Sequence, residues 1–162
     1  MTTPEGPSPV GWFRRSSFFG HTVPSFEHAQ VADVMRAGLI TCQPETRLRG
    51  VAQAMAANHV HALVLLDPGG EDSTHGFKVI YDVDVLKLAA QGQDDARASD
   101  AACTPVTISA GASAKDAARL MHEHSTRHLI VLDEEERAVG VVSSLDLAAA
   151  LAWGIGPPGS GD

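Results

Sequence analysis

The chain has 162 residues, of which 44% are hydrophobic, and its formal net charge is -8. This length accommodates one ordinary domain or two small ones with a working core. The acidic balance argues against a nucleic-acid partner, which needs clustered Lys and Arg, and no apolar run approaches the roughly 18 residues that span a bilayer. We therefore expect a soluble globular protein with no nucleic-acid and no membrane partner.

Two cysteines, Cys42 and Cys103, have none of the spacings typical of metal or redox sites. We interpret both as small core residues in a reducing compartment, which predicts a cytoplasmic protein. The pair Arg14-Arg15 resembles the start of a twin-arginine export signal, but the apolar segment that should follow is replaced by polar residues, Gly and Pro.

Residues 1–28 are rich in Pro, Gly and Ser and lack periodicity, which predicts a flexible arm, and residues 155–162 are expected to form a flexible tail. Five of the eight aromatic residues nevertheless lie in the arm: Trp12, Phe13, Phe18, Phe19 and Phe26. Exposed aromatic side chains are costly without a partner surface. Either the arm packs on its own module or on a second copy, or it is a docking peptide for a different protein.

From residue 29 the chain contains two copies of one pattern. Residues 41–67 align with residues 107–133 at an offset of 66, and beyond a longer first hairpin the offset becomes 62. Aligned pairs include Thr41 with Thr107, Met55 with Met121, Leu63 with Leu129, Asp67 with Asp133, and Asp84 with Asp146. The sequence therefore predicts two repeats, at residues 29–92 and 93–154.

Each repeat predicts the order β-α-β-β-α. Apolar residues at helical spacing begin at Leu48 in the first repeat and at Ala114 in the second, and two short apolar strands and another helix follow each time. One such unit cannot bury both faces of its small sheet. We therefore predict an α+β fold in which the two units pack with pseudo-twofold symmetry, their sheets in contact and their helices outside.

In the second repeat a strand leads into a helix through Gly140-Val-Val-Ser143-Ser-Leu-Asp146. A carboxylate accepts hydrogen bonds from both hydroxyls of a ribose, and a helix N-terminus attracts an anion. The same residues also have structural explanations. Asp146 can be a favourable acid in the first turn of the helix, Ser143 or Ser144 can be its N-cap, and Gly140 can accommodate the twist of the strand. Spacing alone leaves the two interpretations equal.

The duplicated order and this motif resemble a tandem pair of cystathionine-β-synthase-type (CBS) domains, the Bateman module, over about residues 30–153. The resemblance rests on Val31-Ala-Asp-Val-Met35, on Leu63-Val-Leu-Leu-Asp67 and Leu129-Ile-Val-Leu-Asp133, and on the Gly-x-x-Ser/Thr-x-x-Asp motif at residues 140–146. It implies a regulatory protein, not an enzyme, that binds AMP, ADP, ATP or S-adenosylmethionine in a cleft between the repeats. It also implies a homodimer that signals between its subunits or to an unidentified partner protein, with no cofactor besides this regulatory ligand.

Carried over to this sequence, the resemblance implies a set of ligand contacts. The set is Val106, Thr107, Ile108, Arg127, His128, Gly140, Ser143 and Asp146. The backbone of the first three would meet the adenine edge, Arg127 and His128 match positions that contact phosphates, and Ser143 and Asp146 would hold the sugar. Gly140 would leave space for close approach.

The first repeat departs from the motif. Its corresponding run is Lys78-Val-Ile-Tyr81-Asp-Val-Asp84, and a phenol in place of a small hydroxyl is expected to fill part of the sugar pocket. An altered second site would comprise Thr41, His61, Lys78, Tyr81 and Asp84. In the alternative interpretation Tyr81 stacks on a base and Lys78 contacts a phosphate. We expect one good nucleotide site per chain.

Histidines gather near the ends of the two long helices, at residues 59, 61, 122 and 124, with His128 just beyond. No Cys or carboxylate cluster completes a set of metal ligands, so we predict no metal site and interpret these residues as helix C-terminal histidines favoured by the dipole. No nucleophile elbow or phosphate-cradling Gly-rich loop is present, which fits a sensor. The competing hypotheses are an interaction scaffold that uses the aromatic arm and a histidine-based metal-responsive protein.

Overall fold

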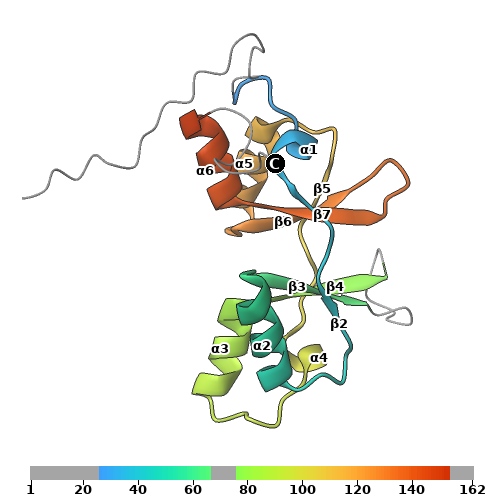
Figure 1. Cartoon of the computed structure of the whole chain (residues 1–162), viewed down its shortest axis with the longest axis vertical. Helices are drawn as coiled ribbons and strands as arrows, with labels where there is room; N and C mark the ends of the chain where they lie inside the picture. The colour runs from blue at the N-terminus through green and yellow to red at the C-terminus, as the bar shows by residue number, and fades with distance from the viewer. Residues whose placement is uncertain (1–25, 67–75, 154–162) are drawn as a thin grey trace, which may run out of the picture.

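The computed structural model describes residues 26–66 and 76–153. They form two lobes, with the sheets facing each other in the middle and the helices on the outer sides (Figure 1). The elements are α1 (Val31–Val34), β1 (Arg36–Ala37), β2 (Thr41–Cys42), α2 (Leu48–Asn58), β3 (Ala62–Leu66), β4 (Phe77–Tyr81), α3 (Asp82–Ala90), α4 (Ala98–Ala101), β5 (Thr107–Ser109), α5 (Ala114–Glu123), β6 (His128–Leu132), β7 (Ala138–Ser143) and α6 (Ser144–Trp153). The predicted β-α-β-β-α order is confirmed twice, from β2 to α3 and from β5 to α6.

Each lobe is built on one small sheet. The first lobe holds β2-β3-β4 and the second holds β1-β7-β6-β5. The strands joined through a helix, β2 with β3 and β5 with β6, pair in parallel, whereas the hairpins β3–β4 and β6–β7 are antiparallel. Because side chains alternate between the two faces of a strand, each hairpin supplies apolar residues both to its own helices and to the other lobe.

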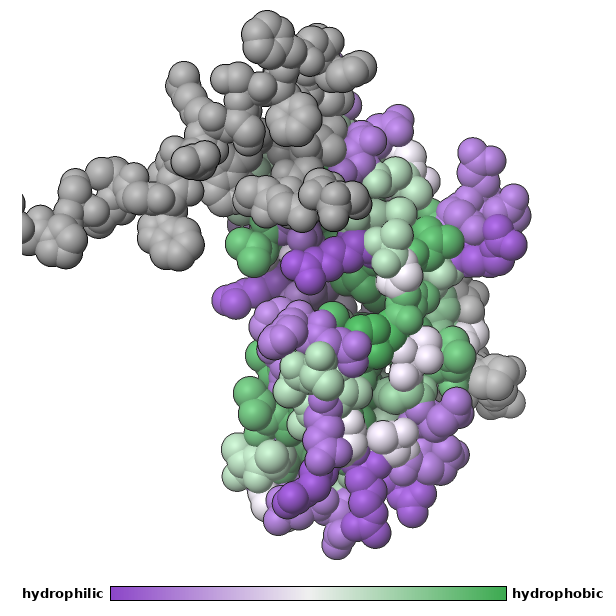
Figure 2. All heavy atoms as spheres, viewed as in Figure 1, coloured by the Kyte–Doolittle hydropathy of each residue, from purple (hydrophilic) through white to green (hydrophobic). Residues whose placement is uncertain are grey.

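The inner faces of the two sheets meet in a shared core. Its buried members are Val64, Phe77, Val79, Ile130 and Leu132. The other face of each sheet is covered by its helices, with Leu63 and Leu65 against α2 in the first lobe and Leu129 and Val131 against α5 in the second. The α+β prediction, with sheets in contact and helices outside, is confirmed. In the space-filling view hydrophobic atoms show at the junction of the lobes and hydrophilic side chains cover the outer end of the first lobe (Figure 2).

The short opening helices are exchanged between the lobes. Val31 of α1 is buried in the core of the second lobe, and Ala98 of α4 is buried in the core of the first. Directly after α1, β1 pairs with β7, and directly after α4, Cys103 forms an isolated bridge with Val79 of β4. Each lobe is therefore completed by the opening segment of the other repeat, while the ranges 29–92 and 93–154 stay a prediction about the sequence repeats.

The helix ends follow the local sequence. The Ser113 hydroxyl caps α5 by accepting from the Asp116 N–H at 3.0 Å. Past the end of α3, Gly92 adopts φ 73°, a conformation that favours glycine after a helix. The equivalent Gly154, the arm at 1–25 and the tail at 155–162 lie outside the described residues.

The prediction that both cysteines are core residues is wrong. Cys42 is half-buried and packs against the core of the first lobe, but Cys103 is exposed, because it lies in the connection that crosses β4. In the described part of the chain, none of the helices is long and apolar enough to cross a membrane.

Candidate functional site

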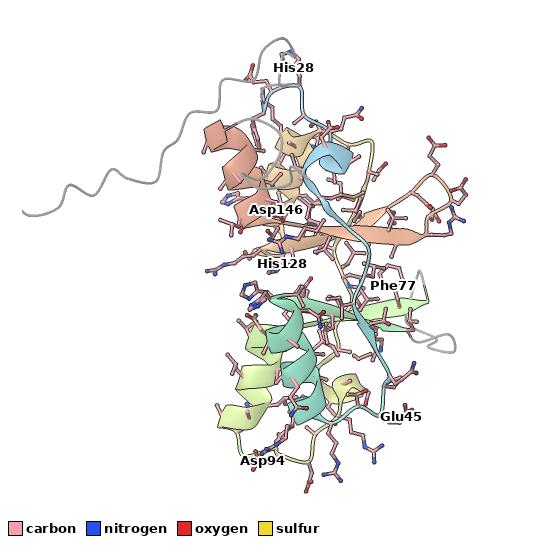
Figure 3. The ribbon with its side chains drawn as sticks, viewed as in Figure 1. His28, Glu45, Phe77, Asp94, His128 and Asp146 are labelled. Carbon is pink, nitrogen blue, oxygen red and sulfur yellow. The ribbon has the colours of Figure 1, made fainter. Side chains whose placement is uncertain are left out.

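The residues implied by the motif converge at one end of the four-stranded sheet. The parallel register pairs Thr107 with Ile130, and the antiparallel register pairs His128 with Ser143, so β5 and β6 begin where β7 ends and α6 starts. The Ser144 N–H donates to the Arg127 carbonyl at 2.8 Å and thereby closes this corner. Most of the predicted set is therefore together, and Figure 3 shows Asp146 and His128 on the side of the second lobe that faces the first.

The Val106–Ile108 segment already uses part of its backbone within the sheet. The Val106 carbonyl accepts from the Ile130 N–H at 3.0 Å, and Ile108 is buried. β5 is nevertheless an edge strand, so its outer edge has no neighbouring strand in the described sheet.

Asp146 and Ser143 hold each other in a reciprocal cap at the start of α6. The Ser143 N–H and hydroxyl both donate to Asp146 Oδ2, at 2.8 and 2.5 Å, and the Asp146 N–H donates to Ser143 Oγ at 3.2 Å. The structural explanation of these residues is thus confirmed, since the motif builds a capping box. It leaves Oδ1 of the carboxylate pointing away from the cap.

The second oxygen of this carboxylate faces a residue that the sequence analysis missed. Arg36 Nε lies 3.5 Å from Asp146 Oδ1, with the Arg36 side chain 66% exposed and the Asp146 side chain 15% exposed. Arg36 reaches this place because β1 pairs with β7, at Arg36 with Val141 and Ala37 with Gly140. The site therefore contains a carboxylate, a hydroxyl, a helix N-terminus and a guanidinium.

Gly140 lies on the other face of β7 from Ser143. A Cβ atom at Gly140 would lie 2.5 Å from the Arg36 carbonyl oxygen and 3.1 Å from Met35 Sδ. The close approach that this glycine permits is thus that of the chain leading into β1. Gly140 supports the site by letting Arg36 approach β7, while its contact with a ligand stays a prediction.

His128 connects the two lobes. Its ring stacks on Tyr81 of β4 with centroids 5.7 Å apart and an interplanar angle of 25°, and its centroid is 6.1 Å from that of His61. Burial lowers the pKa of His128, and the nearby His61 acts in the same direction. Burial likewise raises the pKa of Tyr81 to about 12, so the stack is between two neutral rings at neutral pH.

The altered site of the first repeat is arranged differently. His61 Nδ1 lies 2.7 Å from Asp82 Oδ2, so the first acid of α3 is engaged by the histidine. Asp84 lies close enough to Tyr81 and Cys103 to help raise the pKa of both groups, a smaller effect than that of burial. This places a phenol, a thiol and a carboxylate where the second repeat has Ser143, Arg36 and Asp146.

The remaining two residues predicted for the first-repeat site are less closely placed. Lys78 lies on the face of β4 opposite to Tyr81, where it pairs with Leu65 near the hairpin end of the strand. Thr41 is exposed at the start of β2 and corresponds to Thr107 at the start of β5. The structure therefore brings His61 and Tyr81 to His128 at the junction of the lobes, with Asp84 near Tyr81, and separates Lys78 from them.

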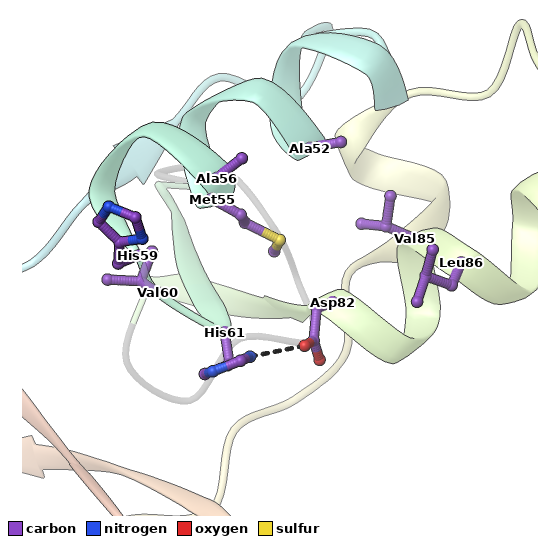
Figure 4. Close-up of a pocket in the computed structure, with 9 residues that line it drawn as sticks. All are labelled: Ala52, Met55, Ala56, His59, Val60, His61, Asp82, Val85 and Leu86. Carbon is purple, nitrogen blue, oxygen red and sulfur yellow. Dashed lines mark hydrogen bonds and ion pairs between the residues drawn. The ribbon is translucent and has the colours of Figure 1, made fainter.

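A pocket of about 370 Å³ opens between α2 and α3 of the first lobe (Figure 4). It is lined by Ala52, Met55, Ala56, His59, Val60, His61, Asp82, Val85 and Leu86. Its walls are mostly apolar and the His61–Asp82 pair lies at its edge. This pocket is in the helical layer of the lobe, and Ser143 and Asp146 do not line it.

Three of the histidines near the helix ends, His59, His122 and His124, are helix-terminal residues, as interpreted from the sequence, whereas His61 lies beyond α2 and pairs with Asp82, and His128 begins β6. His59 is the C-cap of α2 and His124 the C-cap of α5. Among residues 26–66 and 76–153, no group of three or more His, Cys, Asp or Glu side chains is arranged to hold a metal ion.

Comparison with known proteins decides the family. The model of the CBS domain matches residues 31–76 and 98–152, which together make up more than half of the chain. The chain belongs to the CBS domain family. Its two lobes are accordingly a tandem CBS pair, and the two matched regions each begin at an exchanged helix, α1 or α4.

Several known proteins resemble this CBS pair. A CBS domain protein of Pyrobaculum aerophilum, solved in complex with AMP, is 25% identical, and the alignment covers 76% of this chain and 98% of that one with a TM-score of 0.64. Hypoxic Response Protein I, solved with two coordinated zinc ions, is 29% identical over 74% of this chain and 97% of that one, with a TM-score of 0.59. An L-aspartate semialdehyde sulfurtransferase of Methanocaldococcus jannaschii is 38% identical over 48 residues, which are 30% of this chain and only 9% of that protein.

Proposed function

We propose that this CBS pair is a regulatory sensor that binds an adenosyl ligand at the Ser143–Asp146 corner of the second repeat. The carrying observation is the Asp146 carboxylate, which is 15% exposed and fixed at a helix start with one oxygen directed away from its cap. A fixed carboxylate accepts from a vicinal diol without first having to be ordered, and the helix N-terminus favours the phosphate that follows the sugar. AMP, ADP, ATP and S-adenosylmethionine all carry this ribose diol.

The relatives support an adenosyl ligand. The Pyrobaculum aerophilum protein, which shares the fold at 25% identity, was solved with AMP. The corner in this chain has the same ingredients that the family resemblance implies, with Arg127 and His128 beside the start of α6. A regulatory role is proposed rather than a catalytic one, because the corner offers binding groups and lacks an activated nucleophile within the part of the chain described.

The two repeats differ at the position that would admit a sugar. On the first-repeat side Tyr81 stacks across the cleft on His128. The residues that correspond to this pair by the repeat offsets are Ser143 and Ala62, both small. We therefore infer one open site, in the second repeat, and one site obstructed by the Tyr81 ring.

Isothermal titration calorimetry tests this role of Asp146, with AMP, ATP and S-adenosylmethionine as ligands for the wild type and for Asp146→Asn. A hydrogen bond to a charged group contributes about 1.5–3 kcal/mol, so the asparagine variant should bind at least about tenfold more weakly. The wild type is expected to bind one ligand per chain. Unchanged affinity in Asp146→Asn would refute the assignment of this carboxylate.

Asp116→Asn is a matched control. Asp116 forms a similar cap with Ser113, at 2.7 and 3.0 Å, and also pairs with an arginine, Arg119, at 2.7 Å, but it lies at the start of α5. This variant should lose a comparable amount of helix stability and leave ligand affinity unchanged. An equal loss of affinity in both variants would mean that Asp146 acts only through folding.

The proposed signal is a change in the population of cleft geometries, since a ligand that contacts both lobes favours the arrangement to which it binds best. We propose that this change is transmitted across a homodimer or to a partner protein in the cytoplasm. The alternative function, a scaffold that uses the aromatic arm, depends on residues 1–25, which lie outside the described part of the chain.

A further inference from the structure

Arg36 pairs with Asp146 Oδ1, the carboxylate oxygen that a bound ribose would need. Asp146 Oδ2 already accepts twice from Ser143, and Arg36 Nε lies 3.5 Å from Oδ1. A diol that binds to Oδ1 therefore competes with the guanidinium for this carboxylate. Because the Arg36 side chain is 66% exposed, it can rotate away without disturbing the core.

This arginine belongs to the second site alone. Its place is set by β1, where Arg36 pairs with Val141, and the corresponding bridge in the first repeat joins Cys103 to Val79. The residue that stands beside Asp84 is thus a thiol rather than a cation. The two crossings thus place an arginine beside the acid of the second repeat and a cysteine beside the acid of the first.

Displacement has different consequences for different ligands. A guanidinium moved away from its carboxylate loses its anionic partner, and a phosphate on the ligand restores one with two oxygens in suitable geometry. Adenosine offers no anion. S-adenosylmethionine places a cationic sulfonium at its 5′ carbon, and its single carboxylate lies beyond this sulfonium at the end of the methionyl chain. The 5′ substituent lies one sugar ring away from the diol. The long and mostly exposed Arg36 side chain can therefore reach it by rotation.

We propose that Arg36 is a specificity-determining residue whose guanidinium leaves the Asp146 carboxylate and pairs with the phosphate of the bound ligand. The second site then selects adenine nucleotides over neutral and cationic adenosyl compounds. This inference rests on the proposed function, because it assumes that the ribose binds at Asp146.

The test compares the affinities of AMP, adenosine and S-adenosylmethionine for the wild type, Arg36→Gln and Arg36→Lys by calorimetry. The wild type should prefer AMP to adenosine by about tenfold or more, the size expected for a charge-assisted contact. Arg36→Gln should reduce that preference to the part that Arg127 and the start of α6 supply, while adenosine and S-adenosylmethionine bind as well as before or better, since no guanidinium then competes for the carboxylate. Arg36→Lys should keep part of the preference because it keeps the charge.

Arg119→Gln is the matched control, since Arg119 is 68% exposed and paired with an acid at a helix start, Asp116, but lies outside the cleft. It should leave all three affinities unchanged. An AMP-to-adenosine affinity ratio in Arg36→Gln that equals the wild-type ratio would overturn the role of Arg36. Adenosine binding by the wild type without a preference for AMP would overturn this inference and leave the proposed function intact, whereas a wild type that binds none of the three would overturn both.

Discussion

Single residues on the two faces of β7 support the site in different ways. Ser143 lies toward the cleft and caps the helix that carries Asp146. Gly140 lies on the opposite face, against the chain that brings Arg36 to the same carboxylate. The motif therefore combines one residue that fixes the acid with another that makes room for the chain that carries its cation.

We expect Gly140→Ala to destabilise the protein by about 1–3 kcal/mol, the range typical of overpacking. The added Cβ would lie 2.5 Å from the Arg36 carbonyl, a backbone atom that cannot turn aside as a side chain would. Chemical denaturation measures the loss in free energy of unfolding. If β1 shifts to relieve the contact, Arg36 moves away from Asp146, and the preference for AMP should weaken as well.

Gly111→Ala provides the comparison for this substitution. A Cβ at Gly111 would meet only Ser109 Oγ, at 3.8 Å, which is ordinary van der Waals contact. That variant should change the free energy of unfolding by less than about 0.5 kcal/mol, as surface substitutions usually do. Similar stability in both alanine variants would contradict the packing role assigned to Gly140.

At the scale of elements, the sequence predicted most of the architecture. Helical spacing from Leu48 and from Ala114, followed by paired apolar runs, was sufficient for the order of both repeats, because these elements bury whole faces and leave a strong pattern. A cap of α6 by Ser143 or Ser144 was also predicted, and the structure shows Ser143 in this role.

The exchanged segments could not be predicted in the same way. α1 and α4 have four residues each and β1 has two, too few for a periodic signal, and nothing local indicates on which copy they pack. Arg36 was missed for this reason, because its contact with Asp146 depends on that exchange. The only available signal was that Arg36 follows the opening helix of one repeat where the other repeat has Cys103.

The stack between β4 and β6 is the element-scale difference between the two sites. Tyr81→Ser would remove the ring from His128 and restore the small hydroxyl of the motif three residues before Asp84. We expect the calorimetric stoichiometry to rise from one adenosyl ligand per chain toward two, with the new site weaker because Cys103 replaces the arginine. Folding should be checked by thermal melting, since the large-to-small change removes buried surface.

Tyr81→Phe keeps the ring and should keep one ligand per chain. Adding Asp84→Asn to Tyr81→Ser should abolish the new site and leave the first one unaffected. A stoichiometry of two in the wild type, or of one in a folded Tyr81→Ser variant, would show that the phenol does not obstruct the first-repeat site.

At the scale of the whole molecule, the outer helices expose an apolar surface. Val83 and Leu86 on α3 are 64% and 65% exposed, and Leu145 and Leu151 on α6 are 71% and 69% exposed. Val83 and Leu145 occupy equivalent positions in the two repeats, so the surface follows the pseudo-twofold symmetry of the chain. Large exposed apolar side chains on both outer helices are typical of an interface, and a second copy offers a matching surface.

We therefore predict that the wild type is a homodimer and that a double variant, Val83→Glu with Leu145→Glu, is a folded monomer. Each carboxylate would be buried without a partner in the dimer but stay hydrated in the monomer, so dissociation is favoured without loss of the lobe cores. Light scattering after size exclusion measures the mass, and a thermal melt confirms folding.

Gln43→Glu is the control, because it adds a charge at an exposed position between β2 and α2 and should leave the dimer intact. A wild type that is monomeric at high micromolar concentration, or a double variant that remains dimeric, would exclude this surface as the interface, and the ligand signal would then have to pass to a different protein.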